Sequence, residues 1–297
     1  MHRNLATAVV AFAGVVGAFG ASGARALAEQ PLAAGAALVA TSSLEPQDLA
    51  AYPWVGREGE IEQFLRTAPV ERFTDIPVGI TKPRRAHFAP GGLAGSMAWK
   101  PLTRGMLHGK MESYTSEIAA YRLSRALGLD MVPPSVEREL AGRKGAGVYW
   151  IEGVTPWDPA HPPKAPGARW SRQMSRMLLF DQLIGNIDRN RGNLLLDADG
   201  HVFLIDHSRA FVTQTSLSGL KGPHQFDRVL WDRIEALSRA DLDTILRPWL
   251  SGAQVDALVA RRTTIRKAID DRVRERGAQV TFLPDLPVEV ATLSRTP

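Results

Sequence analysis

The residues best suited to chemistry are concentrated in one stretch, residues 185–208, which reads GNIDRNRGNLLLDADGHVFLIDHS. It gathers aspartate and asparagine side chains beside short apolar runs. Carboxylate and amide oxygens are ligands that Mg²⁺ and Mn²⁺ accept, and the chain contains no cysteine that would favour a softer metal. The stretch therefore predicts a site for a hard divalent cation.

A β-hairpin is expected inside this stretch. Two apolar runs, Leu194–Leu196 and Val202–Ile205, flank the turn sequence Asp197-Ala198-Asp199-Gly200. Short apolar runs on either side of such turn residues favour antiparallel pairing. We expect Leu196 to pair with His201 across the turn.

That pairing brings three polar side chains together. Asn193 and Asp206 meet at the open end of the hairpin, and Asp188 lies on the loop that enters it. A single Asx residue in a loop is usually a backbone cap, which is the simpler interpretation of Asp188 or Asn193 taken alone. Three of them in one place predict a cluster of oxygen ligands.

Two other interpretations of the stretch fail. The Asp197–Gly200 sequence resembles the start of an EF-hand loop, but the twelfth position is Ser208 instead of the required glutamate. Asp206-His207-Ser208 contains the residue types of a hydrolytic triad, but consecutive strand residues point to alternate faces and cannot form the relay.

Two upstream elements supply a cation and a carboxylate. Residues 96–102 predict a strand that carries Lys100. Residues 113–127 predict a helix, stopped by Gly128, in which Glu117 falls on the apolar face. An ionised carboxylate on a buried face needs a partner.

A proline-rich segment divides the chain. TPWDPAHPPKAPGARW, residues 155–170, holds five prolines and cannot form a helix or a central strand. Before it, SVEREL and GAGVYWIEGV predict paired strands joined by a turn at residues 142–145. After it, residues 174–184 predict a helix that is apolar on nearly all sides, and further helices are expected at about 225–237, 239–249 and 254–276.

The order and spacing of these residues resemble the protein kinases. Asp188 is followed by an asparagine five positions later and by an aspartate thirteen further on, after a strand, a turn and a strand. The absence of a His-Arg-Asp order and the IDHS that replaces Asp-Phe-Gly are similar to the atypical branch. The phrases SEIAAYRLSRALGLDMVPPS and LIGNIDRNRGNLLL resemble above all the secretory-pathway kinases related to Golgi casein kinase and their bacterial relatives. Phosphoinositide and HipA-type kinases are more distantly similar.

The resemblance covers roughly residues 74–275 and implies an α+β, two-lobed protein-kinase-like fold. A small β-rich N-lobe with one key helix would precede a larger, mainly helical C-lobe. With a basic head at Arg3, an apolar run and a small-residue cleavage site, the chain start predicts a cleaved signal peptide and an exported protein, periplasmic or secreted. The expected organisation is a signal peptide at 1–28, a flexible arm at 29–50, the N-lobe at 51–155, a proline-rich linker at 156–170 and the C-lobe at 171–297.

The resemblance also implies a role for each residue of the cluster. Asp188 corresponds to the catalytic base, and Asn193 and Asp206 to the metal ligands. Lys100 corresponds to the lysine that binds the ATP phosphates, and Glu117 to the carboxylate that holds that lysine.

Further nucleotide contacts are implied in two places. Gly79, Thr81 and Lys82 resemble a short phosphate-covering loop, in which Lys82 either contacts a phosphate or is a solvated turn residue. Glu152 and Val154, at the end of the last strand before the prolines, resemble the hinge that meets adenine.

The function predicted from the residues and the resemblance is an exported atypical kinase. It would transfer the ATP γ-phosphoryl group to a hydroxyl, with a Ser or Thr of a protein substrate as the favoured acceptor and with Mg²⁺ or Mn²⁺. A non-catalytic pseudokinase, a small-molecule or lipid kinase, and a nucleotidyl transferase on the same fold remain alternatives.

Without the signal peptide the formal charge falls from +5 to +3, since the loss of Arg3 and Arg25 leaves 34 basic residues against 31 acidic ones. Scattered charges of this kind do not predict a nucleic-acid partner, and no membrane span is expected after cleavage.

Overall fold

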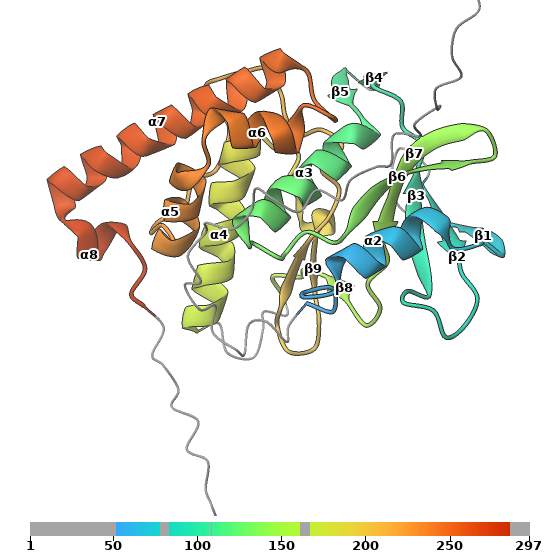
Figure 1. Cartoon of the computed structure of the whole chain (residues 1–297). Helices are drawn as coiled ribbons and strands as arrows, with labels where there is room; N and C mark the ends of the chain where they lie inside the picture. Colours follow the sequence, from blue (N-terminus) through green and yellow to red (C-terminus); the bar gives the residue numbers. More distant parts are fainter. Residues whose placement is uncertain (1–51, 78–82, 108, 161–166, 286–297) are drawn as a thin grey trace, which may run out of the picture. The chain divides into compact units, whose positions relative to one another are not determined.

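The first part of the chain forms an antiparallel sheet of five strands. The computed structural model describes residues 52–77, 83–107, 109–160 and 167–285, all within one compact unit (Figure 1). The strands lie in the order β1-β2-β3-β7-β6. Their bounds are Arg72–Asp75 for β1, Arg84–His87 for β2, Ser96–Lys100 for β3, Ser135–Leu140 for β6 and Arg143–Tyr149 for β7.

The turn between β6 and β7 is tighter than the sequence indicated. Leu140 pairs with Arg143, so the turn consists of Ala141 and Gly142 rather than residues 142–145. Both turn residues have positive φ, 51° and 70°, which matches the two-residue hairpin turns whose twist suits paired strands. Arg143 and its neighbours therefore belong to the strand.

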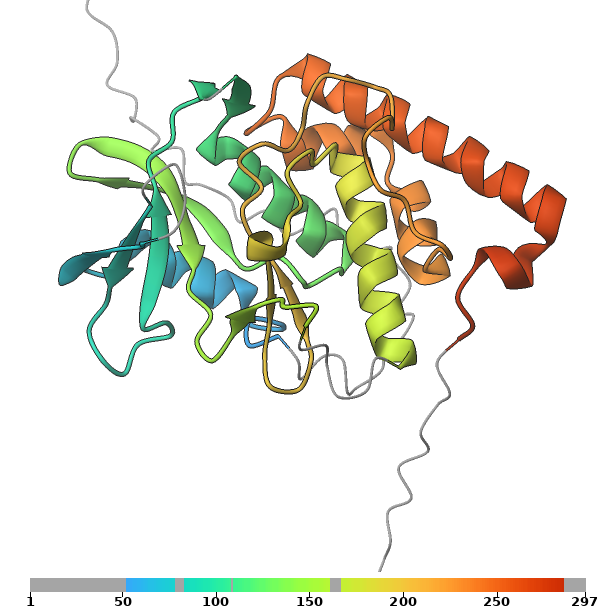
Figure 2. The same ribbon diagram turned by 180° about the vertical axis from the view of Figure 1, so that it is seen from behind.

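Each face of the sheet is covered by a different helix. α2 (Glu58–Thr67) lies on what we call the outer face, where Phe64 meets Phe88 edge-on with ring centroids 5.1 Å apart. α3 (Tyr114–Leu127) contacts the inner face, where Ile118 packs against Ala146 and Val148 of β7. α2 passes in front of the strands in Figure 1 and behind them in Figure 2.

Along β3, successive side chains alternate between these two faces. Ala98 and Lys100 lie on the inner face, because Ala98 packs with the cluster of Ile118. Met97 and Trp99 lie on the outer face and are buried, with 0% and 5% of their surface exposed. The sheet therefore presents Lys100 on the face that contacts α3.

The second part of the chain is mainly helical. α4 (Ala168–Ile184) is followed by the short 3-10 helix η1 (Arg191–Asn193) and by β9 and β10. These two strands form a small sheet of order β10-β9-β8 with β8, which precedes α4. α7 packs against α4 and α6. The remaining bounds are Gly105–Leu107 for β4, Lys110–Glu112 for β5, Thr155–Pro156 for β8, Leu194–Leu196 for β9, Val202–Leu204 for β10, Arg228–Ala236 for α5, Arg239–Leu246 for α6, Gly252–Arg276 for α7 and Ala278–Thr281 for α8.

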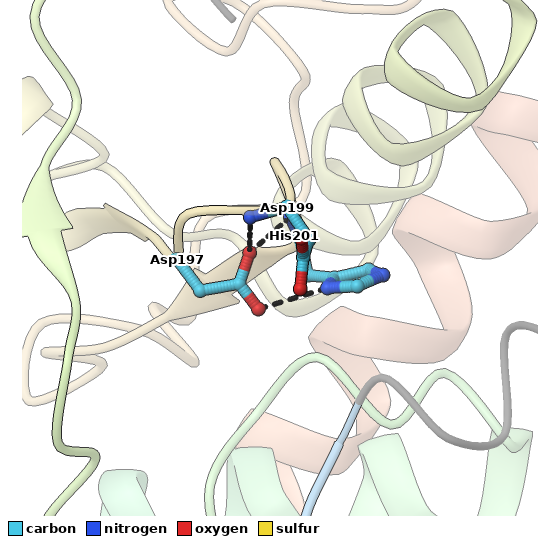
Figure 3. Close-up of side chains that lie close together, drawn as sticks. All are labelled: Asp197, Asp199 and His201. Atoms are coloured by element: carbon cyan, nitrogen blue, oxygen red, sulfur yellow. Dashed lines mark hydrogen bonds and ion pairs between the residues drawn. The ribbon is translucent and has the colours of Figure 1, made fainter.

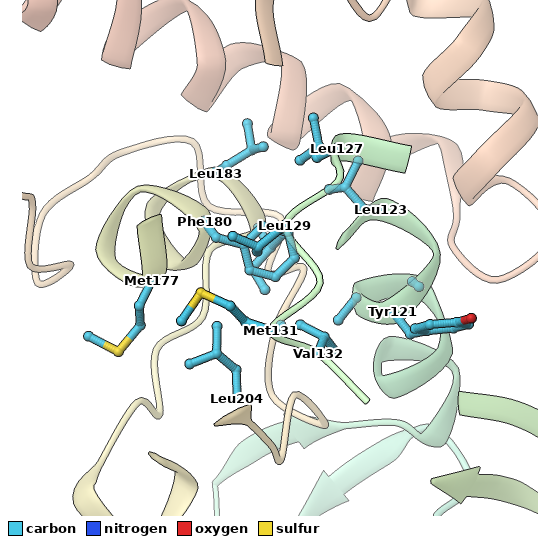
Figure 4. Close-up of a cluster of buried hydrophobic side chains, with 14 of the residues drawn as sticks. Tyr121, Leu123, Leu127, Leu129, Met131, Val132, Met177, Phe180, Leu183 and Leu204 are labelled. Atoms are coloured by element: carbon cyan, nitrogen blue, oxygen red, sulfur yellow. The ribbon is translucent and has the colours of Figure 1, made fainter. Parts of the chain in front are cut away.

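A hydrophobic core joins the two parts of the fold. Figure 4 shows side chains from α3, from the segment that follows it, from α4 and from β10 in one cluster. Phe180 of α4 and Leu123 of α3 are both fully buried. Burial of a leucine or phenylalanine side chain stabilises a fold by about 1.5–3 kcal/mol. This cluster fixes α3 against the elements that carry the predicted cation site.

The hairpin of β9 and β10 has a register that differs by one residue from the predicted one. Leu196 pairs with Val202, not with His201. Asp197 accounts for the difference, since its carboxylate accepts hydrogen bonds from the backbone N–H groups of Asp199 and His201. The turn therefore contains three residues between Asp197 and His201, with Gly200 at φ 82°, a common hairpin form.

The segment before α2 contacts both parts of the fold. Trp54 donates from its indole N–H to the Asp130 carbonyl at 3.0 Å. Its ring lies 5.8 Å from those of Tyr149 in β7 and Phe203 in β10. Tyr52 donates from its hydroxyl to the Val202 carbonyl at 3.1 Å. Residues 52–54 thus lie between the sheet and the hairpin of β9 and β10.

Three predictions concern residues that the structure does not describe. The signal peptide at 1–28, the arm at 29–50 and the loop with Gly79, Thr81 and Lys82 lie outside the described residues. Among the helices that the structure describes, none combines the length and the apolar character needed to cross a membrane.

Candidate functional site

The inner face of the sheet and the first turn of α3 bring a lysine and a glutamate together. Ser113 caps α3 by accepting a hydrogen bond from the N–H of Thr115. This start places Glu117 in the first turn, with only 2% of its surface exposed. Its Oε1 lies 2.6 Å from the Nζ of Lys100. The buried carboxylate thus has the cationic partner that its position requires.

Asp206 is the third member of this charged cluster. It lies two residues after the end of β10 and adopts φ 59°, a left-handed conformation that aspartate tolerates better than most residues. Its Oδ1 lies 3.1 Å from the Nζ of Lys100. The next backbone N–H, that of His207, donates to the other carboxylate oxygen of Glu117 at 3.0 Å. Glu117 therefore holds both Lys100 and the chain beside Asp206.

The three charged groups affect one another's pKa. Burial opposes the charge on Lys100, but attraction by Asp206 and Glu117 outweighs it and raises the pKa of Lys100 above its ordinary value. Lys100 lowers the pKa of Asp206 well below its ordinary value. Burial raises the pKa of Glu117 despite the opposing effect of Lys100. Asp206 is therefore ionised at neutral pH, as a carboxylate ligand of a divalent cation must be.

The loop after α4 holds Asp188 and Asn193. α4 ends at Gly185, which takes the left-handed conformation at φ 63°. Asn193, at the end of η1, donates from its side-chain amide to the backbone carbonyl of Asp188 at 3.1 Å. Because its amide nitrogen is used in this way, the amide oxygen is the atom of Asn193 suited to coordination.

Asn193 and Asp206 are neighbours through the backbone. Ile205, which precedes Asp206, donates its N–H to the carbonyl of Asn193 at 3.2 Å. An ionised carboxylate and an amide oxygen are donors that fit Mg²⁺ or Mn²⁺. These two residues would hold the ion.

Two cations contact the carboxylate of Asp188. Arg209 donates to Oδ2 at 3.0 Å, and Lys110 donates to Oδ1 at 3.3 Å. Arg209 is itself held by Glu112 of β5, whose side chain is 1% exposed, through a hydrogen bond of 2.7 Å from Nε. The orientation of Asp188 is thus set by residues that sequence reasoning did not single out.

Arg189 is a further residue that sequence reasoning missed. It pairs with the buried Asp181 of α4 through two hydrogen bonds of 2.8 and 3.0 Å. It also donates to the carbonyls of Asn193 and Ile205, at 2.7 and 2.9 Å. One guanidinium therefore ties α4, η1 and the end of β10 together. An arginine next to the predicted catalytic base was the available signal, but its partners are up to eighteen residues away.

Arg189 also determines the charge and the tautomer of the His207 imidazole. Its guanidinium lies 2.9 Å from the Nε2 of His207, which must accept because arginine only donates. Burial, followed by the charges of Arg189 and Lys100, lowers the pKa of His207 well below its ordinary value. His207 is therefore neutral and carries its proton on Nδ1.

Asp197, Asp199 and His201 form a separate acidic cluster at the turn between β9 and β10 (Figure 3). Asp197 accepts from two backbone N–H groups, and one of its oxygens lies 2.8 Å from the Nδ1 of His201. These contacts are those of a closed hairpin turn. The cluster agrees with the turn that the sequence predicts.

The remaining predicted residues lie beside the end of β7. Glu152 and Val154 belong to the connection from β7 to β8, and the carboxylate of Glu152 pairs with Arg85 of β2. Arg85 is also absent from the sequence prediction. The described part of the site thus contains Lys100, Glu117 and Asp206 in direct contact, with Asp188 and Asn193 joined on the adjoining loop.

One protein-family model and several solved structures are similar to this chain. A model of the phosphatidylinositol 3- and 4-kinase family matches residues 164–231. No curated protein sequence matches the chain. A structure of Hydra Fam20 with sugar is similar with a TM-score of 0.63 and 15% identity, over 76% of this chain and 92% of that one.

Golgi casein kinase is similar with a TM-score of 0.60 and 14% identity, over 76% of this chain and 77% of the other. A structure of the Golgi casein kinase with Mn/ADP bound gives a TM-score of 0.57 and 14% identity, over 77% of this chain and 80% of the other. At these identities the likeness shows the fold. The prediction of an α+β, two-lobed, atypical kinase-like fold is confirmed.

Proposed function

We propose that the chain is an ATP-dependent phosphotransferase that modifies a hydroxyl group. The observation that carries the proposal is the contact of Lys100 with both Glu117 and Asp206, at 2.6 and 3.1 Å, next to the loop of Asp188. A buried lysine held between two carboxylates provides a fixed positive charge. Phosphoryl transfer requires mainly such positioning and charge neutralisation from a protein.

In the proposed reaction, Lys100 binds and steadies the phosphates of the donor. The acceptor oxygen forms a bond to the γ-phosphorus while the bond from that phosphorus to the ADP oxygen breaks. Asp188 orients the acceptor hydroxyl and takes its proton. A divalent cation held by Asn193 and Asp206 would supply charge neutralisation on the phosphates.

The finer parts of the proposal rest on sequence and similarity. A Ser or Thr hydroxyl of a protein is the acceptor we favour, because the fold is similar to that of Golgi casein kinase. The match to a phosphatidylinositol kinase model favours a headgroup hydroxyl as the second candidate. Mn²⁺ or Mg²⁺ is proposed from the oxygen ligands and from the similar structure with Mn/ADP bound. An exported location is proposed from the first residues of the sequence.

The proposed lobes also follow the sequence boundaries. We propose an N-lobe at residues 51–155, a linker at 156–170 and a C-lobe at 171–297. We propose that Gly79, Thr81 and Lys82 of the N-lobe contact the phosphates of ATP. We propose that the backbone of Glu152 and Val154 contacts the adenine base of ATP.

The test uses the full chain incubated with MnCl₂, casein and ATP labelled at either the α- or the γ-phosphate. We expect label transfer from the γ-position only, whereas transfer from the α-position would indicate a nucleotidyl transferase. Asp188→Asn should lower turnover by about 10²–10⁴-fold and retain metal-dependent nucleotide binding, since only proton transfer is lost.

A second variant separates chemistry from metal binding. Asp206→Asn should lose metal-dependent nucleotide binding together with turnover. Nucleotide binding without transfer to casein or to phosphoinositide vesicles would indicate a pseudokinase. Unchanged turnover in Asp188→Asn would refute the proposed role of that residue.

A further inference from the structure

Arg85 lies on the same face of the sheet as Lys100. In the antiparallel pair of β2 and β3, Arg85 is directly opposite Ala98. Directly opposite residues share a face, and so do residues two apart on one strand. Arg85, Ala98 and Lys100 therefore all lie on the inner face. Arg84, its neighbour, is opposite Trp99 and lies on the outer face.

The guanidinium of Arg85 is held by three groups near the end of β7. Its Nε donates to the hydroxyl of Ser96 at 2.8 Å, and Ser96 is 1% exposed. A terminal nitrogen pairs with the carboxylate of Glu152. The guanidinium lies over the ring of Trp150, 4.3 Å from its centroid. These contacts fix the position of a planar cation beside the connection from β7 to β8.

Stability alone does not explain this arrangement. Glu152 is 65% exposed and Arg85 is 25% exposed. Ion pairs with an exposed partner contribute little to folding, because solvent screens them. A guanidinium that stays partly accessible and is oriented from three sides is instead suited to binding. Its flat surface stacks on aromatic rings, through cation–π and π contacts.

We propose that Arg85 is a nucleotide-binding residue that stacks on the nucleobase of the phosphate donor. This inference rests on the proposed function, which places the donor's phosphates at Lys100 on the same face of the sheet. The base then lies against Ala98 and the guanidinium plane of Arg85. Trp150 and Glu152 keep that plane in place. Stacking acts on the flat face of any base, so both adenine and guanine nucleotides should depend on Arg85.

The experiment compares ligands with and without a base. Dissociation constants for ATP, GTP and inorganic tripolyphosphate are measured by calorimetry with MnCl₂, on the full chain and on three variants. Arg85→Ala removes the cation, and Arg85→Lys retains the charge without the plane. Arg84→Ala is the matched control, because it removes an arginine of the same strand from the outer face, where it lies 4.5 Å over the ring of Phe73.

We expect Arg85→Ala to weaken ATP and GTP binding by about three- to thirty-fold, the range of a cation–π contact. Tripolyphosphate binding should change by less than about twofold, since that ligand has no base to stack. Arg85→Lys should retain only part of the affinity for ATP, and Arg84→Ala should leave all three ligands unchanged. The ratio of ATP to tripolyphosphate affinity separates base contact from damage to the fold, which would weaken both.

Four results would overturn the inference. Equal weakening of ATP and tripolyphosphate would make Arg85 a structural residue, and unchanged ATP binding would exclude a base contact. Tighter ATP binding in Arg85→Ala would mean that the side chain obstructs the base. If the unmodified chain binds neither ATP, GTP nor tripolyphosphate, the proposed function fails and the inference fails with it. The first three results leave the proposed function standing.

Discussion

Replacement of Arg189 by methionine should strongly destabilise the fold. Methionine keeps an unbranched apolar stem but removes the charge and every donor. Asp181, with a side chain only 5% exposed, would lose two charged hydrogen bonds. The carbonyls of Asn193 and Ile205 would lose contacts of 2.7 and 2.9 Å. A buried carboxylate would then remain, with the side-chain amide of Asn186 donating to it at 2.9 Å.

Removal of one partner of a buried ion pair costs about 3–5 kcal/mol. That is a large part of the roughly 5–15 kcal/mol by which domains are stable. We therefore expect Arg189→Met to lower the free energy of unfolding by about 3–5 kcal/mol. Arg189→Lys should cost less, about 1–3 kcal/mol, because an ammonium keeps the charge but cannot reach the same set of acceptors.

Urea titration followed by circular dichroism measures these changes. Arg191→Met is the matched control, since Arg191 is exposed two residues further along the chain and its replacement should stay within about 0.5 kcal/mol. In the double variant with Asp181→Asn, the loss should be smaller than the sum of the single losses, because the two side chains share one interaction. A loss below about 1 kcal/mol for Arg189→Met, at an unchanged urea slope, would refute the reasoning.

Three other changes test different parts of the structure. Burial raises the pKa of Asp130 to about 6 from its ordinary 3.8. The folded state therefore holds this proton more tightly than the unfolded state, and the free energy of unfolding falls as pH rises from about 4 to 6. Asp130→Asn should flatten that pH dependence in urea titrations and add about 1–3 kcal/mol to the free energy of unfolding at neutral pH. A Cβ on Gly145 would lie 2.6 Å from the carbonyl oxygen of Lys100. Gly145→Ala should therefore lower the free energy of unfolding by about 1–3 kcal/mol and weaken ATP binding. Gly95→Ala is the control, because a Cβ there meets no atom within 4 Å. Trp54→Ala should speed amide exchange in β9 and β10 as strongly as in β7, and faster exchange in β7 alone would contradict its role between them.

Most of the elements that could be predicted from the sequence follow from local patterns of residues. The helix with Glu117 has an N-cap at Ser113 and a stop at Gly128, and both act within a few residues. The strand with Lys100 and the hairpin before Asp206 were likewise expected from short runs of apolar and turn residues. These elements required no knowledge of distant contacts.

The predictions that failed concerned the length of turns, which a side-chain contact fixes in one case and a backbone conformation in the other. The register of β9 and β10 is displaced by one residue because Asp197 closes the turn with His201. The turn before β7 is two residues long because Ala141 adopts φ 51°, a conformation rare for alanine. Neither property follows from the apolar pattern of the strands.

The supporting arginines of the site were beyond reach for a different reason. Arg85 meets Glu152 across 67 residues of sequence, and Arg209 meets Glu112 across 97. Charged residues are frequent in this chain, so a single arginine gives no sign of its distant partner. Only the strand pairing and the packing of the helices decide which of them meet.

The position of Tyr52 and Trp54 has a mechanical consequence. The β7–β8 connection joins the sheet to the helical part covalently, and these two side chains join the same regions by packing and hydrogen bonds. Together with the hydrophobic core around α3, these attachments restrain the sheet against the helical part. We therefore expect the position of Lys100 beside Asp206 to depend on side chains as distant in the sequence as Tyr52 and Trp54.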